Sequence, residues 1–136
     1  MSGFTTDEGE VLLAQIIHQR THVDRDADLE LGLFTDADAA ETITEATISE
    51  PTGGGYARKS LSDASWSVDG NGLATFAQQT FSVSGTDYSA DVYGYFIASK
   101  SSGGTQRLLY VEIDPAGPFD LNVADFYKIT PQVQLS

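Results

Sequence analysis

Two histidines stand one helical turn apart in the first quarter of the chain. A spacing of four residues places His18 and His22 on one face of a helix, where two imidazoles can bind the same metal ion. The helical metal motif of this spacing carries a glutamate directly after its first histidine, whereas Gln19 stands here, and the spacing indicates no third ligand. We therefore predict no metal site at this pair and interpret both as histidines of a helix surface or helix end.

Residues 24–28 hold three aspartates at alternating positions, which is the first half of a calcium-binding loop. An EF-hand requires glycine at the sixth position and glutamate at the twelfth, but Leu29 and Thr35 stand there. The sequence therefore excludes an EF-hand. An irregular calcium site that uses these aspartates, or Asp36 and Asp38, is the alternative to acidic loops that are simply solvated, and we adopt the solvated loops.

Residues 53–59, Gly-Gly-Gly-Tyr-Ala-Arg-Lys, combine backbone amides with two cations, a composition that suits anions. They lack the first glycine, the spacing and the Lys-Ser/Thr ending of a P-loop, and they lead into a predicted strand rather than a helix. We interpret them as a flexible turn.

Catalytic motifs are missing from the sequence. The chain has no cysteine, which excludes a thiolate nucleophile, a thiolate metal site and disulfides. No Gly-x-Ser-x-Gly elbow occurs, and no pair of acidic residues stands out as the acid and base of a glycosidase. We predict that the protein is not an enzyme and that it binds no cofactor.

Seven aromatic residues occupy mostly alternating positions in predicted strands. Core packing is the usual role of such positions, and we predict it here. Stacking on a ligand is the alternative role for any of them. The seven are Trp66, Phe76, Phe81, Tyr93, Phe96, Tyr110 and Tyr127.

The charge of the chain is strongly negative and uneven. The 136 residues carry a net charge of −13, and the first fifty contribute twelve acidic side chains against Arg20 and Arg25, a net of −10. Such a field repels phosphate backbones, so we predict no nucleic-acid partner. We expect no secretion signal and no membrane span, because the start lacks a basic region and no apolar run approaches about 20 residues.

A helix is predicted near the start of the chain. Thr5 and Glu8 have the spacing of a capping box, and four apolar residues at spacings of three and four give one apolar face to a helix over Thr6–Gln19. We assign residues 1–27 to an N-terminal helical segment and residues 28–136 to a β-domain. The apolar face consists of Leu12, Leu13, Ile16 and Ile17.

The remainder of the chain has the period of two that is typical of strands. Residues 28–33 alternate between apolar residues and polar residues or glycine, which predicts a strand with one solvent-exposed face. The threonine-rich stretch Ile43–Ser49 favours a β-conformation. Ala90–Ser99 is apolar on both sides, which predicts a central strand. The run Asp69–Gly72 predicts a hairpin turn. Seven to nine short strands at this spacing indicate an all-β fold of the β-sandwich or jelly-roll type, with one N-terminal helix.

The order of the segments carries a resemblance to a known group. Short motifs follow the apolar helix: Leu29-x-Leu31-x-Leu33-Phe34-Thr35, Thr44-Glu45-Ala46, Gly55-Tyr56-Ala57-Arg58 with Leu61, Trp66, Val92-Tyr93-Gly94-Tyr95-Phe96, and Ile129-Thr130-Pro131. Over nearly the whole chain this order resembles a widespread group of small virion proteins of tailed phages, frequent in cyanophages, some of which are head decoration or cement proteins. In that group the Leu-Phe-Thr stretch often continues with asparagine and a nearby proline, whereas Asp36-Ala37-Asp38 follows here.

The resemblance implies a protein that is made in the host cytoplasm and placed on the capsid exterior of the virion. There it would bind the major capsid protein as a homo-oligomer, a dimer or a trimer, and stabilise the shell. A carbohydrate-binding or receptor-binding module of a tail or fibre is the alternative.

We expect the N-terminal part of the chain to make the contact with the shell. Its acidic residues would guide docking and its apolar helix face would hold the partner; the alternative is that this face covers the domain's own sheet. The predicted contact residues are Leu12, Leu13, Ile16, Ile17, Asp24, Asp26, Asp36 and Asp38.

Overall fold

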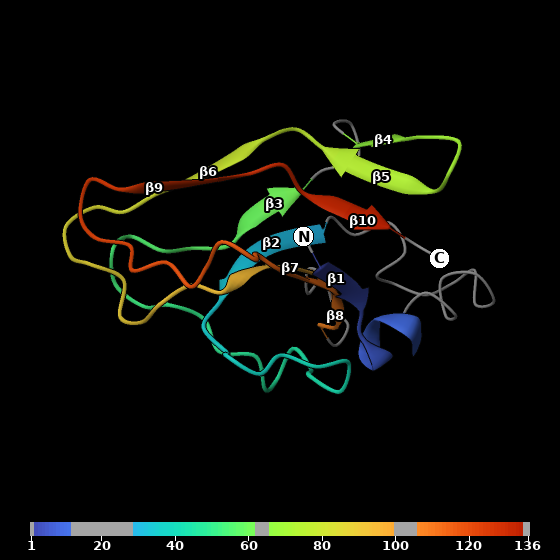
Figure 1. Cartoon of the computed structure of the whole chain (residues 1–136), viewed down its shortest axis with the longest axis horizontal. Helices are drawn as coiled ribbons and strands as arrows, with labels where there is room; N and C mark the ends of the chain where they lie inside the picture. Colours follow the sequence, from blue (N-terminus) through green and yellow to red (C-terminus); the bar gives the residue numbers. More distant parts are fainter. Residues whose placement is uncertain (1, 12–28, 62–65, 100–105, 135–136) are drawn as a thin grey trace.

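The fold is all-β, as the sequence predicts. The computed structural model of the chain describes residues 2–11, 29–61, 66–99 and 106–134, and within them ten strands form three antiparallel sheets (Figure 1). The count exceeds the seven to nine expected. Of the described residues, only 7–11 are helical.

The largest sheet has five strands and is the frame of the molecule. Its order is β1 (Ser2–Thr5), β8 (Leu108–Ile113), β7 (Gly94–Ser99), β2 (Leu29–Phe34) and β3 (Lys59–Leu61). Strand β7 lies at the centre and is buried at all six positions. The prediction of a central strand that is apolar on both sides is therefore confirmed.

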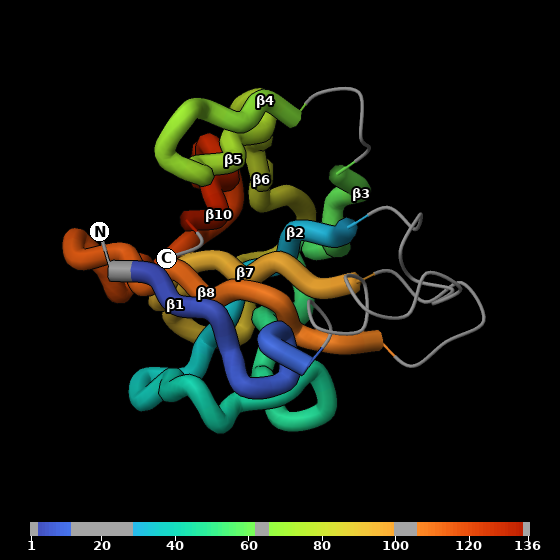
Figure 2. The backbone as a smooth tube through the Cα atoms, turned by 90° about the vertical axis from the view of Figure 1, so that its right-hand side faces the viewer, coloured from blue at the N-terminus to red at the C-terminus, as the bar shows by residue number. Residues whose placement is uncertain are grey.

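Two smaller sheets form a second layer over one face of this frame. In Figures 1 and 2 they lie above it. One has the order β10 (Gln132–Gln134), β5 (Leu73–Phe76), β4 (Trp66–Val68), and the other pairs β6 (Gln79–Ser82) with β9 (Phe126–Ile129). The larger apolar cluster joins the layers, because Leu31 and Ile97 of the frame share it with Phe76, Phe81 and Ile129.

The opposite face of the frame carries a second apolar cluster, centred on Phe34, Phe96 and Leu108 and covered by Ile48. The prediction that one face of β2 is exposed to solvent was therefore wrong. Gly32 is buried, and a Cβ atom there would lie 2.3 Å from the ring of Phe96. The position looked polar in sequence because it lacks a side chain, and the ring of the neighbouring strand fills that space.

The stretch Ile43–Ser49, predicted to favour a β-conformation, is a series of turns instead. The amide of Ile48 donates to the carbonyl of Thr44 at 2.9 Å, and the amide of Thr44 donates to Thr47 Oγ1 at 3.0 Å. Threonine hydroxyls compete in this way with sheet hydrogen bonds, so a threonine-rich stretch can fold locally.

The start of the chain differs from the predicted capping box by one residue. Thr5 ends β1, opposite Tyr110 of β8, and the buried Thr6 caps the helical residues by accepting a hydrogen bond from the Gly9 amide at 2.9 Å. Residues 2–5, which we assigned to the helical segment 1–27, thus belong to the main sheet. The boundary at residues 27 and 28 and the apolar face with Leu12 and Ile17 lie outside the described residues.

The predicted turns are confirmed where they fall in the described residues. Asp69 Oδ1 accepts from the amides of Asn71 and Leu73 at 2.8 and 3.0 Å and closes the β4–β5 hairpin. Gly53, Gly54 and Gly55 all have positive φ angles, 76°, 60° and 73°, a conformation that glycine adopts without strain. This turn leads into β3, as expected.

Candidate functional site

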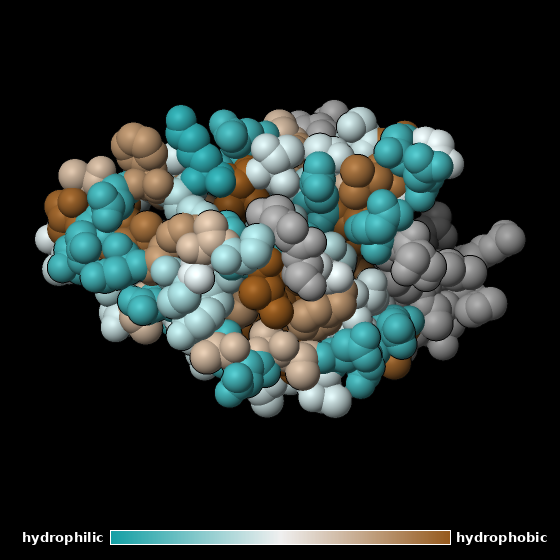
Figure 3. Space-filling model, viewed as in Figure 1, coloured by the Kyte–Doolittle hydropathy of each residue, from teal (hydrophilic) through white to brown (hydrophobic). Residues whose placement is uncertain are grey.

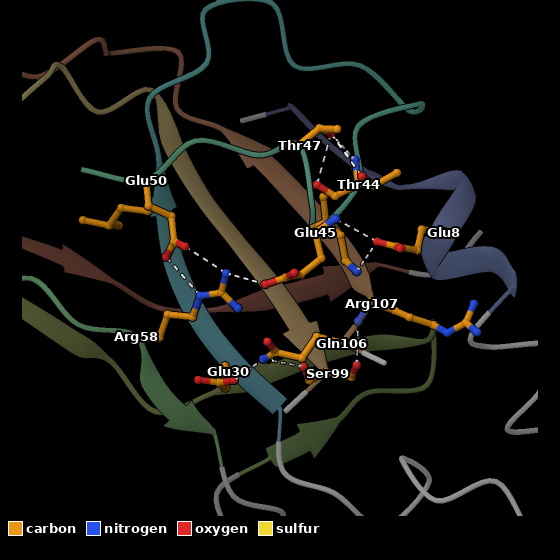
Figure 4. Close-up of polar contacts among 12 residues, drawn as sticks. Glu8, Glu30, Thr44, Glu45, Thr47, Glu50, Arg58, Ser99, Gln106 and Arg107 are labelled. Atoms are coloured by element: carbon orange, nitrogen blue, oxygen red, sulfur yellow. Dashed lines mark hydrogen bonds and ion pairs between the residues drawn. The ribbon is translucent and has the colours of Figure 1, made fainter. Parts of the chain in front are cut away.

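A partly buried group of charged side chains joins the segment 35–50 to the main sheet. We call Glu45, Glu50, Tyr56 and Arg58 the Arg58 cluster. The guanidinium of Arg58 donates from Nη2 to Glu45 Oε1 at 2.7 Å and to Glu50 Oε2 at 2.9 Å, and from Nε to Glu50 Oε1 at 3.0 Å. Figure 4 shows the two glutamates on either side of the guanidinium. One cation therefore holds two carboxylates from a single loop.

The Arg58 cluster is tied to the frame through an aromatic hydroxyl and an aromatic ring. Tyr56 Oη donates to Glu50 Oε1 at 2.6 Å and accepts from the amide of Leu33 in β2 at 2.9 Å. The guanidinium carbon of Arg58 lies 5.0 Å from the centre of the Phe96 ring in β7, a favourable position for a cation on an aromatic face. Strands β2 and β7 thus position the cluster.

The charges of the cluster are set by this pairing. Burial acts to raise the pKa of Glu50, but hydrogen bonds from Arg58 and Tyr56 and the charge of Arg58 lower it below its usual value overall. Burial acts to lower the pKa of Arg58, and its hydrogen bonds to Glu50 and Glu45 raise it instead. Burial and the bond to Glu50 raise the pKa of Tyr56. All three groups keep their neutral-pH protonation states, which suits an anchor rather than a proton-transfer site.

Glu8 links the segment 35–50 to the start of the chain. One oxygen of Glu8, Oε2, accepts from the amide of Glu45 at 2.8 Å and from the amide of Leu108 in β8 at 2.7 Å. The helical residues, the segment 35–50 and strand β8 are therefore held by a single carboxylate. Neither this link nor the Arg58 cluster was predicted from the sequence. The sequence pointed to the cluster only through the two adjacent cations, Arg58 and Lys59. Glu45 and Arg58 also both lie in motifs on which the resemblance rests.

Exposed carboxylates gather where the helical residues meet the segment 35–50. The amide of Asp7 donates to the carbonyl of Glu41 at 2.9 Å and joins the two segments, which lie side by side below the sheet in Figures 1 and 2. We call the exposed residues Asp7, Glu10, Asp38 and Glu41 the acidic end.

Of the predicted contact residues, only two are described. Asp38 is exposed and belongs to the acidic end, whereas Asp36 is half-buried and its Oδ2 accepts from the amide of Ser49 at 2.8 Å. The other six lie outside the described residues: Leu12, Leu13, Ile16, Ile17, Asp24 and Asp26. His18 and His22 lie outside them too.

The described ranges hold neither a cluster of metal ligands nor a membrane-spanning helix. No three histidine, cysteine, aspartate or glutamate side chains within residues 2–11, 29–61, 66–99 and 106–134 come together to hold a metal ion. No helix in the same ranges has the length and apolar character of a membrane span.

The aromatic residues mainly pack against other apolar groups, as predicted. Phe76, Phe81, Phe96 and Tyr110 are buried. Two more make ring contacts: Trp66 lies 5.2 Å from the Phe76 ring and Tyr127 5.1 Å from the Phe119 ring. Trp66 packs against the larger apolar cluster and Tyr93 against the smaller one, so these two do not share a stacking platform.

One buried carboxylate in β8 lacks full hydrogen bonding. Glu112 is 6% exposed, its Oε1 accepts from Tyr110 Oη at 3.1 Å, and its Oε2 has no hydrogen-bond partner among the described residues. Burial raises the pKa of Glu112, and the bond from Tyr110 counteracts the rise only in part.

Substitution of Glu112 by glutamine tests this pKa shift. A carboxyl whose pKa is raised in the folded state is held protonated there, so the wild type loses stability as pH rises from the unfolded-state pKa through the folded-state pKa. Glu112→Gln removes this loss. In urea titrations at several pH values from 4 upward, we expect the unfolding free energy of the wild type to fall relative to the variant. Parallel curves for the two proteins would contradict the assignment.

Comparison with known proteins gave no relative: no family model matches the chain, and no curated protein or solved structure matches it significantly.

Proposed function

We propose that the chain is a virion structural protein that decorates the outside of a tailed-phage head, where it binds the major capsid protein and stabilises the shell. The resemblance supports this proposal through one observation, the meeting of its motifs at Arg58. Arg58 binds Glu45 directly and is joined to Tyr56 through Glu50. The Leu33 amide donates to Tyr56, and the Phe96 ring faces Arg58. Motifs that are distant in sequence thus form one structural unit, as expected for a shared fold.

The acidic end is the described surface best suited to the shell. It holds four exposed carboxylates, and Val11 beside it is 49% exposed. On the face shown in Figure 3, apolar side chains form patches separated by hydrophilic ones. Charge therefore guides the docking to basic groups of the capsid protein, over a range of about 8 Å at physiological salt.

The position of the chain in the virion is tested by electron cryo-microscopy of purified particles that contain it. Density for the two-layered β-fold on the outer surface of the head, with the acidic end toward the shell, is the expected result. Density at the tail or on a fibre would overturn the proposal.

The role of the acidic end is tested by neutralising two of its carboxylates. Deletion of the N-terminal residues is unsuitable, since β1 would be lost from the main sheet. We expect Asp38→Asn/Glu41→Gln to weaken rebinding to stripped shells by up to about thirtyfold, because each exposed ion pair contributes roughly 0 to 1 kcal/mol. The effect should fade as salt is raised.

The matched control neutralises two exposed aspartates elsewhere, Asp91 and Asp120, beside the bridge between Val92 and Phe119. Asp91→Asn/Asp120→Asn changes the net charge equally and should leave rebinding unchanged. Equal weakening by both double variants would show that only the overall charge matters.

Light scattering of the isolated protein tests the homo-oligomer, and a strict monomer at high concentration would contradict a dimer or trimer.

A further inference from the structure

A small polar hollow lies between the residues that lead into β3 and strand β6. Its volume is about 240 Å³, below the roughly 300 to 1,000 Å³ of pockets for drug-sized ligands, so it suits one ring or one side chain. Its lining comes from the turn at Gly55, the start of β3, strand β6 and Tyr88. The lining residues are Gly55, Ala57, Arg58, Lys59, Thr80, Phe81, Ser82 and Tyr88.

The two cations of this lining differ in their charge balance. Arg58 pairs with two carboxylates, those of Glu45 and Glu50, whereas Lys59 has no carboxylate partner among the described residues. The Lys59 ammonium instead lies 5.1 Å from the centre of the Phe81 ring, where the ring face attracts it but brings no negative charge. Lys59 is therefore the cation of the hollow that is not paired with a carboxylate of the described residues.

A second residue of the lining that can form hydrogen bonds is Tyr88. Tyr88 is 6% exposed, and its hydroxyl has no hydrogen-bond partner in the described part of the chain. Its ring packs edge-on against Tyr56 at 5.8 Å between ring centroids. Burial raises the pKa of Tyr88, so the phenol stays protonated and able to donate. A phenol O–H can donate to an oxygen of a ligand that enters the hollow.

We propose that this hollow binds the carboxylate of an acidic sugar, with Lys59 as the ionic partner and Tyr88 as a hydrogen-bond donor. A single ammonium that is not paired with a carboxylate matches a monoanion, and the net charge of −13 repels phosphate-rich chains. The hydroxyl-bearing residues Thr80 and Ser82 in the lining favour a ligand that carries hydroxyls besides its carboxylate. This inference goes beyond the proposed head decoration and does not depend on it.

Binding at this site should be weak and polar. The Phe81 ring is only 3% exposed, since Lys59 and the stacked Tyr56 lie against it, so no ring face is open for sugar stacking. We expect dissociation constants of about 1 mM for a single acidic sugar. Display of several copies on one particle would strengthen attachment to a surface glycan.

The test is titration of the isolated, isotopically labelled protein with sugars, followed by amide chemical shifts in NMR spectra. N-acetylneuraminic acid and methyl glucuronide should shift amides of the hollow, and methyl glucoside, which lacks the carboxylate, should not. Lys59→Gln should weaken binding at least about tenfold. Lys59→Arg, which keeps the charge, should retain most of it, and Tyr88→Phe should weaken it severalfold while keeping the ring contact with Tyr56.

Lys128→Gln is the matched control. Lys128 also lies over an aromatic ring, that of Phe126 at 5.6 Å, but does not line the hollow, so binding should be unchanged. An equal loss in Lys59→Gln and Lys128→Gln would overturn the site. If acetate and N-acetylglutamate amide bind as tightly as the acidic sugars, the hollow takes an acidic protein side chain and the sugar assignment is wrong. Absence of shifts with every acidic sugar up to about 20 mM, well above the expected dissociation constant, would also overturn it.

Discussion

Replacement of Arg58 by methionine is expected to lower the free energy of unfolding by about 2 to 4 kcal/mol. Methionine keeps the apolar stem of the side chain and removes the guanidinium, so Glu45 and Glu50 lose a cation at 2.7 and 2.9 Å. Breaking a fully buried ion pair costs roughly 3 to 5 kcal/mol. These side chains are 15 to 25% exposed, and water reaching the freed carboxylates reduces that cost.

Two further variants separate the loss of the cluster from a general effect of losing an arginine. Arg107 is also half-buried, but Figure 4 shows its guanidinium pointing away from the cluster, and no carboxylate among the described residues pairs with it. Arg107→Met should change stability by no more than about 0.5 kcal/mol. The triple variant Arg58→Met/Glu45→Gln/Glu50→Gln should recover part of the loss, since it leaves no buried charge without a partner.

The loss of stability caused by Arg58→Met is expected to depend on pH in a defined direction. The pKa of Glu50 is lowered in the folded state, so its contribution to stability is present above the unfolded-state pKa and is lost as pH falls through the folded-state pKa. The difference between wild type and Arg58→Met in urea titrations should therefore shrink below about pH 4.5. A difference that stays constant into acid, or a loss no larger than that of Arg107→Met, would show that the cluster does not anchor the loop.

Features set by local sequence were predictable here. The turns at Asp69–Gly72 and Gly53–Gly55 follow from residues that adopt turn conformations without strain. The central position of β7 follows from apolar residues on both of its faces. In each case the determining residues are neighbours in the chain, so a short window contains the whole signal.

Features set by distant contacts were not predictable. Arg58 meets carboxylates 8 and 13 residues away, and Glu8 binds a backbone amide 100 residues away, separations that correspond to no helix or strand period. Regular alternation over Ala90–Ser99 places Val92 on the face of Phe96 and Tyr93 on the face of Tyr95, and this prediction was wrong. Val92 packs in the cluster that contains Tyr95 and Tyr93 packs against the other one, because the regular strand begins only at Gly94. Strand boundaries depend on the partner strand, which a single segment does not reveal.

Gly94 illustrates how a motif residue can serve the sheet itself. It begins β7, between Phe34 of β2 and Ile113 of β8. A Cβ atom at Gly94 would lie 2.0 Å from the carbonyl oxygen of Glu112 and 3.1 Å from the amide nitrogen of Asp114. Both atoms belong to the backbone of the neighbouring strand and its end, so no side-chain rotation can relieve the overlap.

Gly94→Ala is accordingly expected to lower the free energy of unfolding by about 3 kcal/mol, the upper end of the usual cost of overpacking, because the backbone must move. Gly32→Ala should cost less, since there the clash is with the Phe96 ring, a side chain. Gly70→Ala is the control: a Cβ atom at Gly70 meets nothing within 4 Å and its φ is not positive, so the change should be nearly neutral. Urea denaturation of the three variants measures this order, and equal stability of Gly94→Ala and Gly70→Ala would show that the main sheet tolerates a side chain between β7 and β8.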